Sequence, residues 1–222
     1  MPHLLLAPLL FGIKWLDPEW MLDHFGSAFF WVSLVIIVIE CGLFFPFLPG
    51  DTLLVAIGVF VASDKLSVIP GPALLDIAVA CLLLVGAAMV GNVLGFEIGS
   101  KAGPVIYEHD GRILKRSYFE RTEDFFDRHG RQALVIGRFV PVVRTYVTVV
   151  AGASKMKRPR FLLWSLVGAL LWVLSITLTG YFVGDTFPGL AKNIDYLILG
   201  LLLLTIIPAG IHWWRERGSE GD

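Results

Sequence analysis

The sequence predicts an all-α membrane protein built as an inverted repeat, in which two opposed re-entrant helical hairpins accompany transmembrane helices and a cytoplasmic interfacial helix. Of the 222 residues, 56% are hydrophobic and only 17% are charged, and the mean hydropathy is +0.74, values typical of a chain embedded in lipid. Several apolar segments reach the roughly 20 residues that a bilayer-spanning helix needs. Two further apolar segments are interrupted by proline, which breaks helices.

We expect a single membrane domain over residues 1–222. Its parts, in chain order, are an N-terminal interfacial segment (1–25), a re-entrant hairpin (28–61), a transmembrane helix (74–96), a cytoplasmic amphipathic helix (113–131), a second re-entrant hairpin (133–153) and two transmembrane helices (161–183 and 194–214). The first twelve residues are apolar but lack the basic leading region and the small-residue cleavage site of a secretory signal. We therefore expect them to be retained and to lie at the membrane interface.

Prolines shape both predicted hairpins. Pro46, Pro49 and Gly50 interrupt the first apolar segment, and Pro141 interrupts the second. Because proline removes a backbone donor and clashes with the preceding turn, each segment is expected to enter the membrane, turn and leave on the same side. Non-helical backbone at that depth must be buried in protein or line a wet cavity. Gly152 is expected to permit close packing or turning near the end of the second hairpin.

Basic residues predict the orientation. Segments 111–131 and 155–160 and the C-terminal tail are rich in Lys and Arg, whereas segments 62–72 and 184–193 hold one Lys each. The positive-inside rule places the basic group, and with it the C-terminus, in the cytoplasm. The hairpins then enter from opposite faces, which is the layout of inverted-repeat transporters.

Residues 116–132 have the pattern of an interfacial helix. Ser117 and Glu120 match a capping box, and the aromatic residues are spaced toward one side. We expect the apolar side to lie on lipid and the charged side to face water. A helix that binds a partner protein is the alternative.

Four charges fall inside the two interrupted segments: Glu40 and Asp51 in the first, Arg138 and Arg144 in the second. Ionisable side chains within a membrane are costly and tend to mark pathways or relays. The structural interpretation is that these acids and arginines neutralise one another and only lock the hairpins together.

The functional interpretation assigns the two kinds of charge to different tasks. Arg138 and Arg144 carry forked donors suited to a phosphate. Removal from water favours the neutral form of a carboxylic acid, so Glu40 or Asp51 could exchange protons. Asp51 is also a candidate N-cap of the following helix, whose positive end would favour an anion. Together these residues predict a site for an anionic headgroup coupled to protons.

Two long motifs resemble the paired signatures of the DedA family, also called the VTT or SNARE-associated domain family. They are "ECGLFFPFLPGD", which begins at Glu40, and "GRFVPVVRTYVTVVAGASKM", which spans Gly137 to Met156. The resemblance covers the chain from about residue 28 to the C-terminus. It implies two opposed re-entrant hairpins in an inverted repeat and a multi-pass protein of the bacterial inner membrane.

The resemblance also implies a substrate class. Bacterial members resemble translocases of undecaprenyl phosphate, and other members act on phospholipids as scramblases. The motif acids and arginines of the family match Glu40, Asp51, Arg138 and Arg144 in this sequence. The expected function is therefore movement of undecaprenyl phosphate, or a related lipid phosphate, between leaflets with proton coupling.

Other classes of function remain as alternatives. An enzyme acting on lipid phosphates would need a nucleophile or a metal site, yet the five histidines are scattered, so no enzymatic activity is expected. No cofactor, metal or nucleic-acid partner is expected, and the only predicted partners are a membrane lipid and protons. A phospholipid scramblase and a non-transporting membrane-homeostasis factor are the remaining alternatives. The oligomeric state is left open.

Overall fold

The computed structural model describes residues 17–43, 49–108, 126 and 128–186. Every regular element in these ranges is helical, so the all-α prediction is confirmed for this part of the chain. The α-helices are α1 (Pro18–Phe25), α2 (Phe29–Gly42), α3 (Gly50–Ala62), α4 (Ala73–Glu108), α6 (Ala133–Ile136), α7 (Pro141–Ala153) and α8 (Arg158–Thr186). Short 3-10 turns, η3 (Gly26–Ala28), η4 (Gly130–Gln132) and η5 (Gly137–Phe139), precede α2, α6 and α7.

Three helical stretches of the described chain are long and apolar enough to cross a membrane. They are Pro18–Gly42, Ala73–Lys101 and Arg158–Thr186. The second and third contain the predicted spans 74–96 and 161–183. The first joins α1, η3 and α2, and so links the end of the expected interfacial segment to the first arm of the expected hairpin. The predicted span 194–214 and most of the predicted amphipathic helix 113–131 lie outside the described residues.

The helix boundaries follow local rules. Asp17 caps α1 by accepting a hydrogen bond from the backbone N–H of Glu19 at 2.9 Å. Val140 has extended backbone (φ −107°, ψ 111°) and Pro141 opens α7. A residue before proline is driven away from helical geometry, while proline itself is well placed in a first helical turn. The predicted break at Pro141 is therefore confirmed as a helix boundary.

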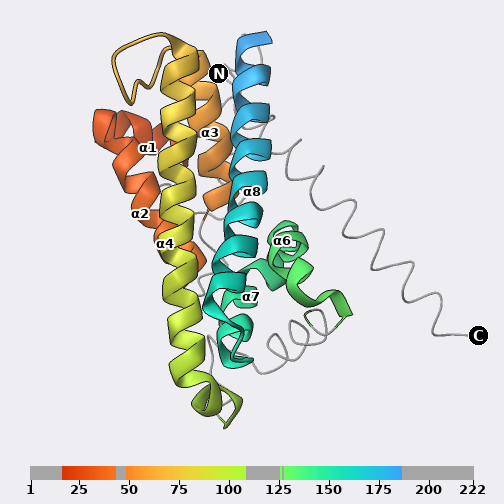
Figure 1. Ribbon diagram of the computed structural model, residues 1–222. Coiled ribbons are helices and arrows are strands. Elements are labelled where there is room, and N and C mark those ends of the chain that lie inside the picture. Colours follow the sequence, from red (N-terminus) through yellow and green to blue (C-terminus); the bar gives the residue numbers. More distant parts are fainter. Residues whose placement is uncertain (1–16, 44–48, 109–125, 127, 187–222) are drawn as a thin grey trace, which may run out of the picture.

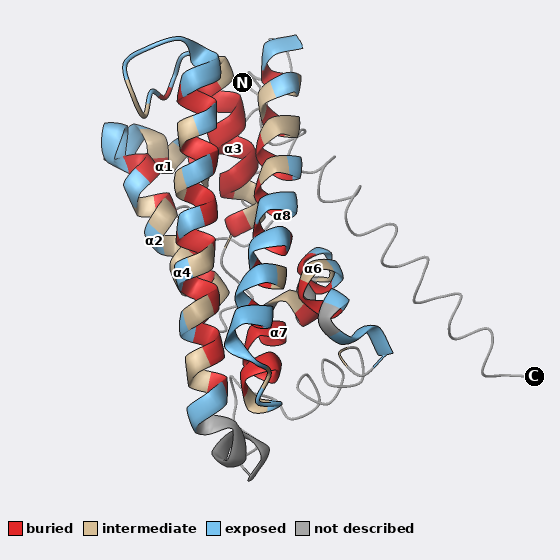
Figure 2. Ribbon diagram, in the orientation of Figure 1, coloured by how far each residue is buried: buried red, intermediate tan, exposed pale blue. Residues whose placement is uncertain are grey.

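The first interrupted segment is also divided into two helices. α2 ends at Gly42, and α3 begins at Gly50 with Pro49 as its N-cap residue. Pro46 lies outside the described residues. Beyond its first turn, α3 is apolar on all sides. The helix is too short to span a bilayer, and most of its residues are buried (Figure 2).

Two long helices organise the bundle. α4 and α8 run in opposite directions along the molecule, with α3 packed on one half of α8 and α7 on the other half of α4 (Figure 1). The outward faces of α4 and α8 are exposed and apolar, and include Leu82, Val90, Leu163 and Leu171. Such faces suit contact with lipid chains. Asn92 of α4 donates a hydrogen bond to Ser165 Oγ of α8 at 2.8 Å in the buried interface.

Glycines permit close approach in both short-to-long helix contacts. A Cβ added to Gly58 of α3 would lie 2.7 Å from the backbone nitrogen of Tyr181, and one added to Gly152 of α7 would lie 2.8 Å from that of Ser100. Both contacts contain the same reciprocal arrangement of two glycines. Between α3 and α8, Gly58 meets Thr177 and Gly180 meets Val55, and between α7 and α4, Gly152 meets Phe96 and Gly99 meets Val149. On each helix, the glycine follows the residue that is met by three positions. Small residues at such crossings allow backbone-to-backbone packing in membranes.

Candidate functional site

The four predicted charges converge where α2, α3, η5, α7 and α8 meet. We call Glu40, Asp51, Arg138 and Arg144 the charge cluster. Glu40 lies near the end of α2, Asp51 in the first turn of α3, Arg138 in η5 and Arg144 in the first turn of α7. The two interrupted segments therefore bring their helix ends together, as the sequence predicts.

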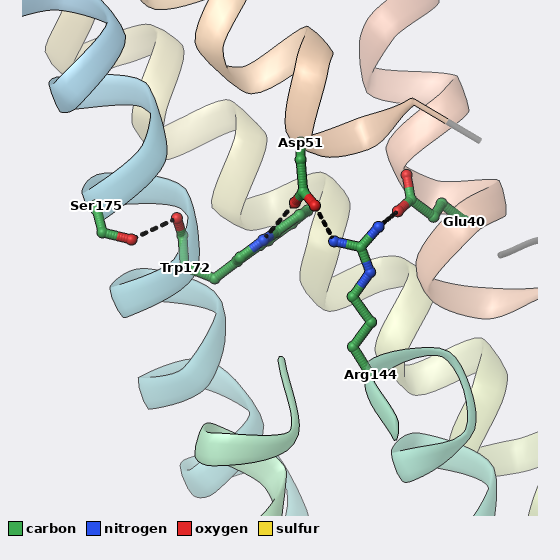
Figure 3. Close-up of polar contacts among 5 residues, drawn as sticks. All are labelled: Glu40, Asp51, Arg144, Trp172 and Ser175. Carbon is green, nitrogen blue, oxygen red and sulfur yellow. Dashed lines mark hydrogen bonds and ion pairs between the residues drawn. The ribbon is translucent and has the colours of Figure 1, made fainter. Parts of the chain in front are cut away.

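Arg144 joins both acids. Its Nη2 donates to Glu40 Oε1 at 2.8 Å, and its Nη1 donates to Asp51 Oδ2 (Figure 3). The guanidinium is planar and carries donors on separate nitrogens, so one arginine can bridge two carboxylates that come from different helices. Arg144 thus ties the second interrupted segment to both arms of the first.

The two acids differ in their access to solvent. The side chain of Glu40 is 5% exposed, whereas that of Asp51 is 30% exposed and that of Arg144 is 17% exposed. Gly50 lies directly against the Glu40 carboxyl group, and a Cβ there would be 2.8 Å from Glu40 Cδ. A side chain at this point would displace the Glu40 carboxyl group, so Gly50 permits the close approach of α3 to Glu40. Glu40 is therefore the buried acid of the pair, and Asp51 is the partly exposed one.

Asp51 does not act as the N-cap of α3. Pro49 occupies the cap position and Asp51 is the second helical residue, so the expectation of a capping role is wrong. Its carboxylate instead accepts a hydrogen bond from Trp172 Nε1 at 2.9 Å through Oδ1 and one from Arg144 through Oδ2 (Figure 3). The contacts with Arg144 and Trp172, both distant in the sequence, therefore position this carboxylate in place of a capping bond.

Arg138 occupies a different environment from Arg144. It is 6% exposed, and its guanidinium lies 5.8 Å from the centroid of the Trp172 ring and within hydrogen-bonding reach of the Cys41 thiol. Arg138 Nε has no hydrogen-bond partner among the described residues, and none of the carboxylates described forms an ion pair with this arginine. A buried cation of this kind is a costly feature that a bound anion would stabilise.

Trp172 is the member of the site that the sequence analysis missed. It sits at the middle of α8, donates to Asp51 and presents its ring to Arg138. Tryptophan in membrane proteins concentrates at the two interfaces. Its position in the middle of a predicted span could therefore have indicated that the indole N–H has a polar partner there. Its indole connects α8 to both interrupted segments.

Gly152 and Pro141 are not members of the charge cluster. Gly152 packs α7 against α4, as expected for a residue that permits close approach. Pro141 opens α7 three residues before Arg144 and so sets the helix start that carries this arginine. Across the described residues, no group of three or more His, Cys, Asp or Glu side chains is placed to hold a metal ion.

Comparison with known proteins gives a consistent relationship. Residues 48–182 match the VTT domain. The chain is 34% identical to an uncharacterized membrane protein of Mycobacterium leprae over 97% of this chain and 91% of that protein. It is 33% identical to Protein DedA of Escherichia coli, covering 89% and 87% of the two chains, and 35% identical to the inner membrane protein YqjA of the same species, covering 88% and 89%. No solved structure matches the chain.

Proposed function

The chain belongs to the DedA family of VTT-domain membrane proteins, and on this premise we propose that it moves a lipid phosphate, foremost undecaprenyl phosphate, between membrane leaflets with proton coupling. The observation that supports this most directly is the charge cluster, in which Arg144 is held by two acids while Arg138 is buried without a carboxylate partner among the described residues. The assigned partners are a membrane lipid and protons, and the activity is transport rather than catalysis.

The proposed mechanism is an exchange of partners at Arg144. In the described state, Glu40 and Asp51 occupy the donors that a phosphate would need. Protonation of the acids would remove their negative charge and weaken their hold on the guanidinium. An entering phosphate would then bind Arg144 and the adjacent Arg138. Loss of the protons on the other side would restore the ion pairs and expel the phosphate.

The packing supports a transporter layout. α3 packs on α8 and α7 on α4, with the same two-glycine spacing in both contacts. We propose that these pairs are corresponding parts of an inverted repeat, that residues 28–61 and 133–153 are re-entrant hairpins, and that alternating access is a movement of one half against the other. The proposed location is the bacterial inner membrane, with the C-terminus in the cytoplasm by the positive-inside rule.

The test is lipid movement in proteoliposomes. Fluorescent or isotopically labelled undecaprenyl phosphate is measured in each leaflet, with and without a pH gradient, for wild type, Arg144→Ala and Glu40→Gln proteins that remain folded. Arg158→Ala is the matched control, because Arg158 forms an exposed ion pair with Glu97 at 2.6 Å, away from the cluster. The proposal is supported if wild type and Arg158→Ala both move the lipid in response to the gradient while Arg144→Ala and Glu40→Gln do not. Equal movement in all four proteins contradicts it.

A non-transporting homeostasis factor is the second candidate, favoured by the closed ion-pair network around Arg144. If the cluster serves only to lock the helices, the double variant Glu40→Arg with Arg144→Glu should recover part of the function in cells, since it re-forms the ion pair between positions 40 and 144, although the new carboxylate at position 144 then faces Asp51. A transporter with a phosphate-binding arginine at position 144 should remain inactive in this variant. Movement of phospholipids with equal efficiency and without a gradient would instead identify a scramblase.

A further inference from the structure

A basic hollow lies where the turn between α7 and α8 meets the residues that lead into α6. Its volume is about 640 Å³, and it is lined by Phe126, His129, Gly130, Gln132, Lys155, Met156, Lys157 and Arg160. None of these residues belongs to the charge cluster. The basic hollow is therefore a separate feature that the proposed transport mechanism does not use.

The lining carries an excess of positive charge. Lys155, Lys157 and Arg160 are exposed, and no carboxylate is among the described residues that line the basic hollow. Arg158 on the same turn differs, because it is paired with Glu97 of α4. The charges in the hollow are thus arranged for an anion that comes from outside the described chain.

Apolar side chains complete the lining beneath this charge. Phe126 and Met156 pack against the hydrophobic cluster that contains Phe96 and Phe161. A basic rim above an apolar floor fits a lipid headgroup, since the phosphate can bind the rim while the adjoining glycerol and chain carbons contact the floor. A free inorganic anion would use only the rim.

The backbone at Lys155 provides an independent observation. Lys155 has a φ of 53°, in the left-handed region. Its N–H donates to Gly152 O at 3.0 Å and the next N–H, of Met156, donates to Ala151 O at 3.1 Å. This is the helix-ending geometry in which glycine is strongly preferred. A long charged side chain at a position that glycine fits better indicates that the side chain itself is needed there.

We propose that the basic hollow binds the phosphate group of an anionic phospholipid, with Lys155, Lys157 and Arg160 as the phosphate-contacting residues. The site lies at the end of the bundle where α7 finishes and α8 begins, apart from the charge cluster. This inference goes beyond the proposed function, because headgroup binding here does not require that the chain transports lipid.

The test is a binding titration with the purified full chain in a zwitterionic detergent. Dioctanoyl phosphatidic acid is titrated calorimetrically, with dioctanoyl phosphatidylcholine and inorganic phosphate as separate arms. We expect saturable binding of the phosphatidic acid alone. Lys155→Gly should weaken this binding about fivefold, the factor that corresponds to the roughly 1 kcal/mol that one basic residue contributes at an anionic membrane surface. The same variant should keep or raise the thermal unfolding temperature, because glycine relieves the backbone at this position.

Two matched controls separate the hollow from general effects. Asp64→Gly relieves the second left-handed non-glycine residue of the described ranges, with φ 55°, and lies in the α3–α4 connection, so it should leave lipid binding unchanged. Lys101→Ala removes an exposed cation that does not line the hollow and should also leave binding unchanged.

Three outcomes would overturn the proposal. The first is that Lys155→Gly and Lys157→Gln both bind phosphatidic acid as tightly as wild type. The second is that Lys101→Ala loses as much affinity for phosphatidic acid as these two variants. The third is that inorganic phosphate binds as tightly as the lipid. Leaflet transfer that fails in liposomes while these binding differences persist would remove the proposed function and leave this site in place.

Discussion

Trp172 donates its indole N–H to the Asp51 carboxylate at 2.9 Å, from the middle of α8 to the first turn of α3. The same ring faces the Arg138 guanidinium at 5.8 Å. A single neutral side chain therefore contacts one acid and one base of the charge cluster. Trp172 therefore helps to position Asp51 and Arg138 without changing the net charge of the site.

Replacement of Trp172 by phenylalanine should separate the hydrogen bond from the packing. The aromatic face remains near Arg138, but Asp51 loses a donor, and a hydrogen bond to a charged group contributes about 1.5–3 kcal/mol. We expect a lower thermal unfolding temperature and slower leaflet transfer in Trp172→Phe. Trp31→Phe, at a lipid-facing position that is 58% exposed, is the control and should change neither. Transfer at the wild-type rate in Trp172→Phe would show that Asp51 needs no positioning by α8.

Replacement of Arg144 tests the bridge between the two acids. Arg144→Ala leaves Glu40 buried without its cationic partner, and breaking a buried pair from one side typically costs about 3–5 kcal/mol. Arg144→Lys keeps the charge but offers a single ammonium in place of a fork, so its loss should be intermediate. Denaturation in detergent, followed by tryptophan fluorescence, measures the order. The exposed Arg158→Ala should cost no more than about 1 kcal/mol, and a similar loss in both alanine variants would count against the bridge.

The glycine contacts predict opposite effects for the same substitution. Gly58→Ala and Gly152→Ala place a methyl group against the backbone of α8 and of α4, so each should destabilise the protein by about 1–3 kcal/mol. Gly86→Ala lies within α4 with open space around it and should stabilise the helix by up to about 1 kcal/mol, since alanine is the better helix former. Thermal melts of the three variants check this. A loss in Gly86→Ala equal to the others would contradict the packing explanation.

The buried link between α4 and α8 can be tested by a double-mutant cycle. Asn92→Ala leaves Ser165 without its donor, and Ser165→Ala leaves the Asn92 amide without its acceptor, so each single change should cost about 1–3 kcal/mol. The double variant should lose less than the sum of the two, because neither polar group is then left alone. Strict additivity of the unfolding free energies would show that this bond contributes nothing.

The sequence predicted those features that one residue can impose locally. Pro141 required a helix start and an extended residue before it, and the structure has both. The pairing of Glu40 and Asp51 with an arginine was also predictable, because a carboxylate in lipid is too costly to leave without a partner. Neither inference needed knowledge of how the helices pack.

Partner choice within the site could not be predicted in the same way. Arg144 pairs with both acids, while Arg138 faces an aromatic ring. This difference depends on how α2, α3 and α8 approach each other. The capping expectation for Asp51 failed for the same reason, since a local rule favoured the cap and a long-range contact prevailed. Trp172 was missed because its importance comes from two residues that are distant in the sequence.

The burial of α3 has a consequence for how the protein is made. This helix is shorter than a bilayer is thick, and α8, on which it packs, follows α4 and α7 in the chain and is therefore synthesised last of these four helices. Until then, α3 has no partner along that face and cannot reach both membrane surfaces by itself. Its final position should therefore be taken late, when α8 inserts, so truncation of the nascent chain before α8 is expected to leave α3 accessible to thiol-reactive probes at introduced cysteines.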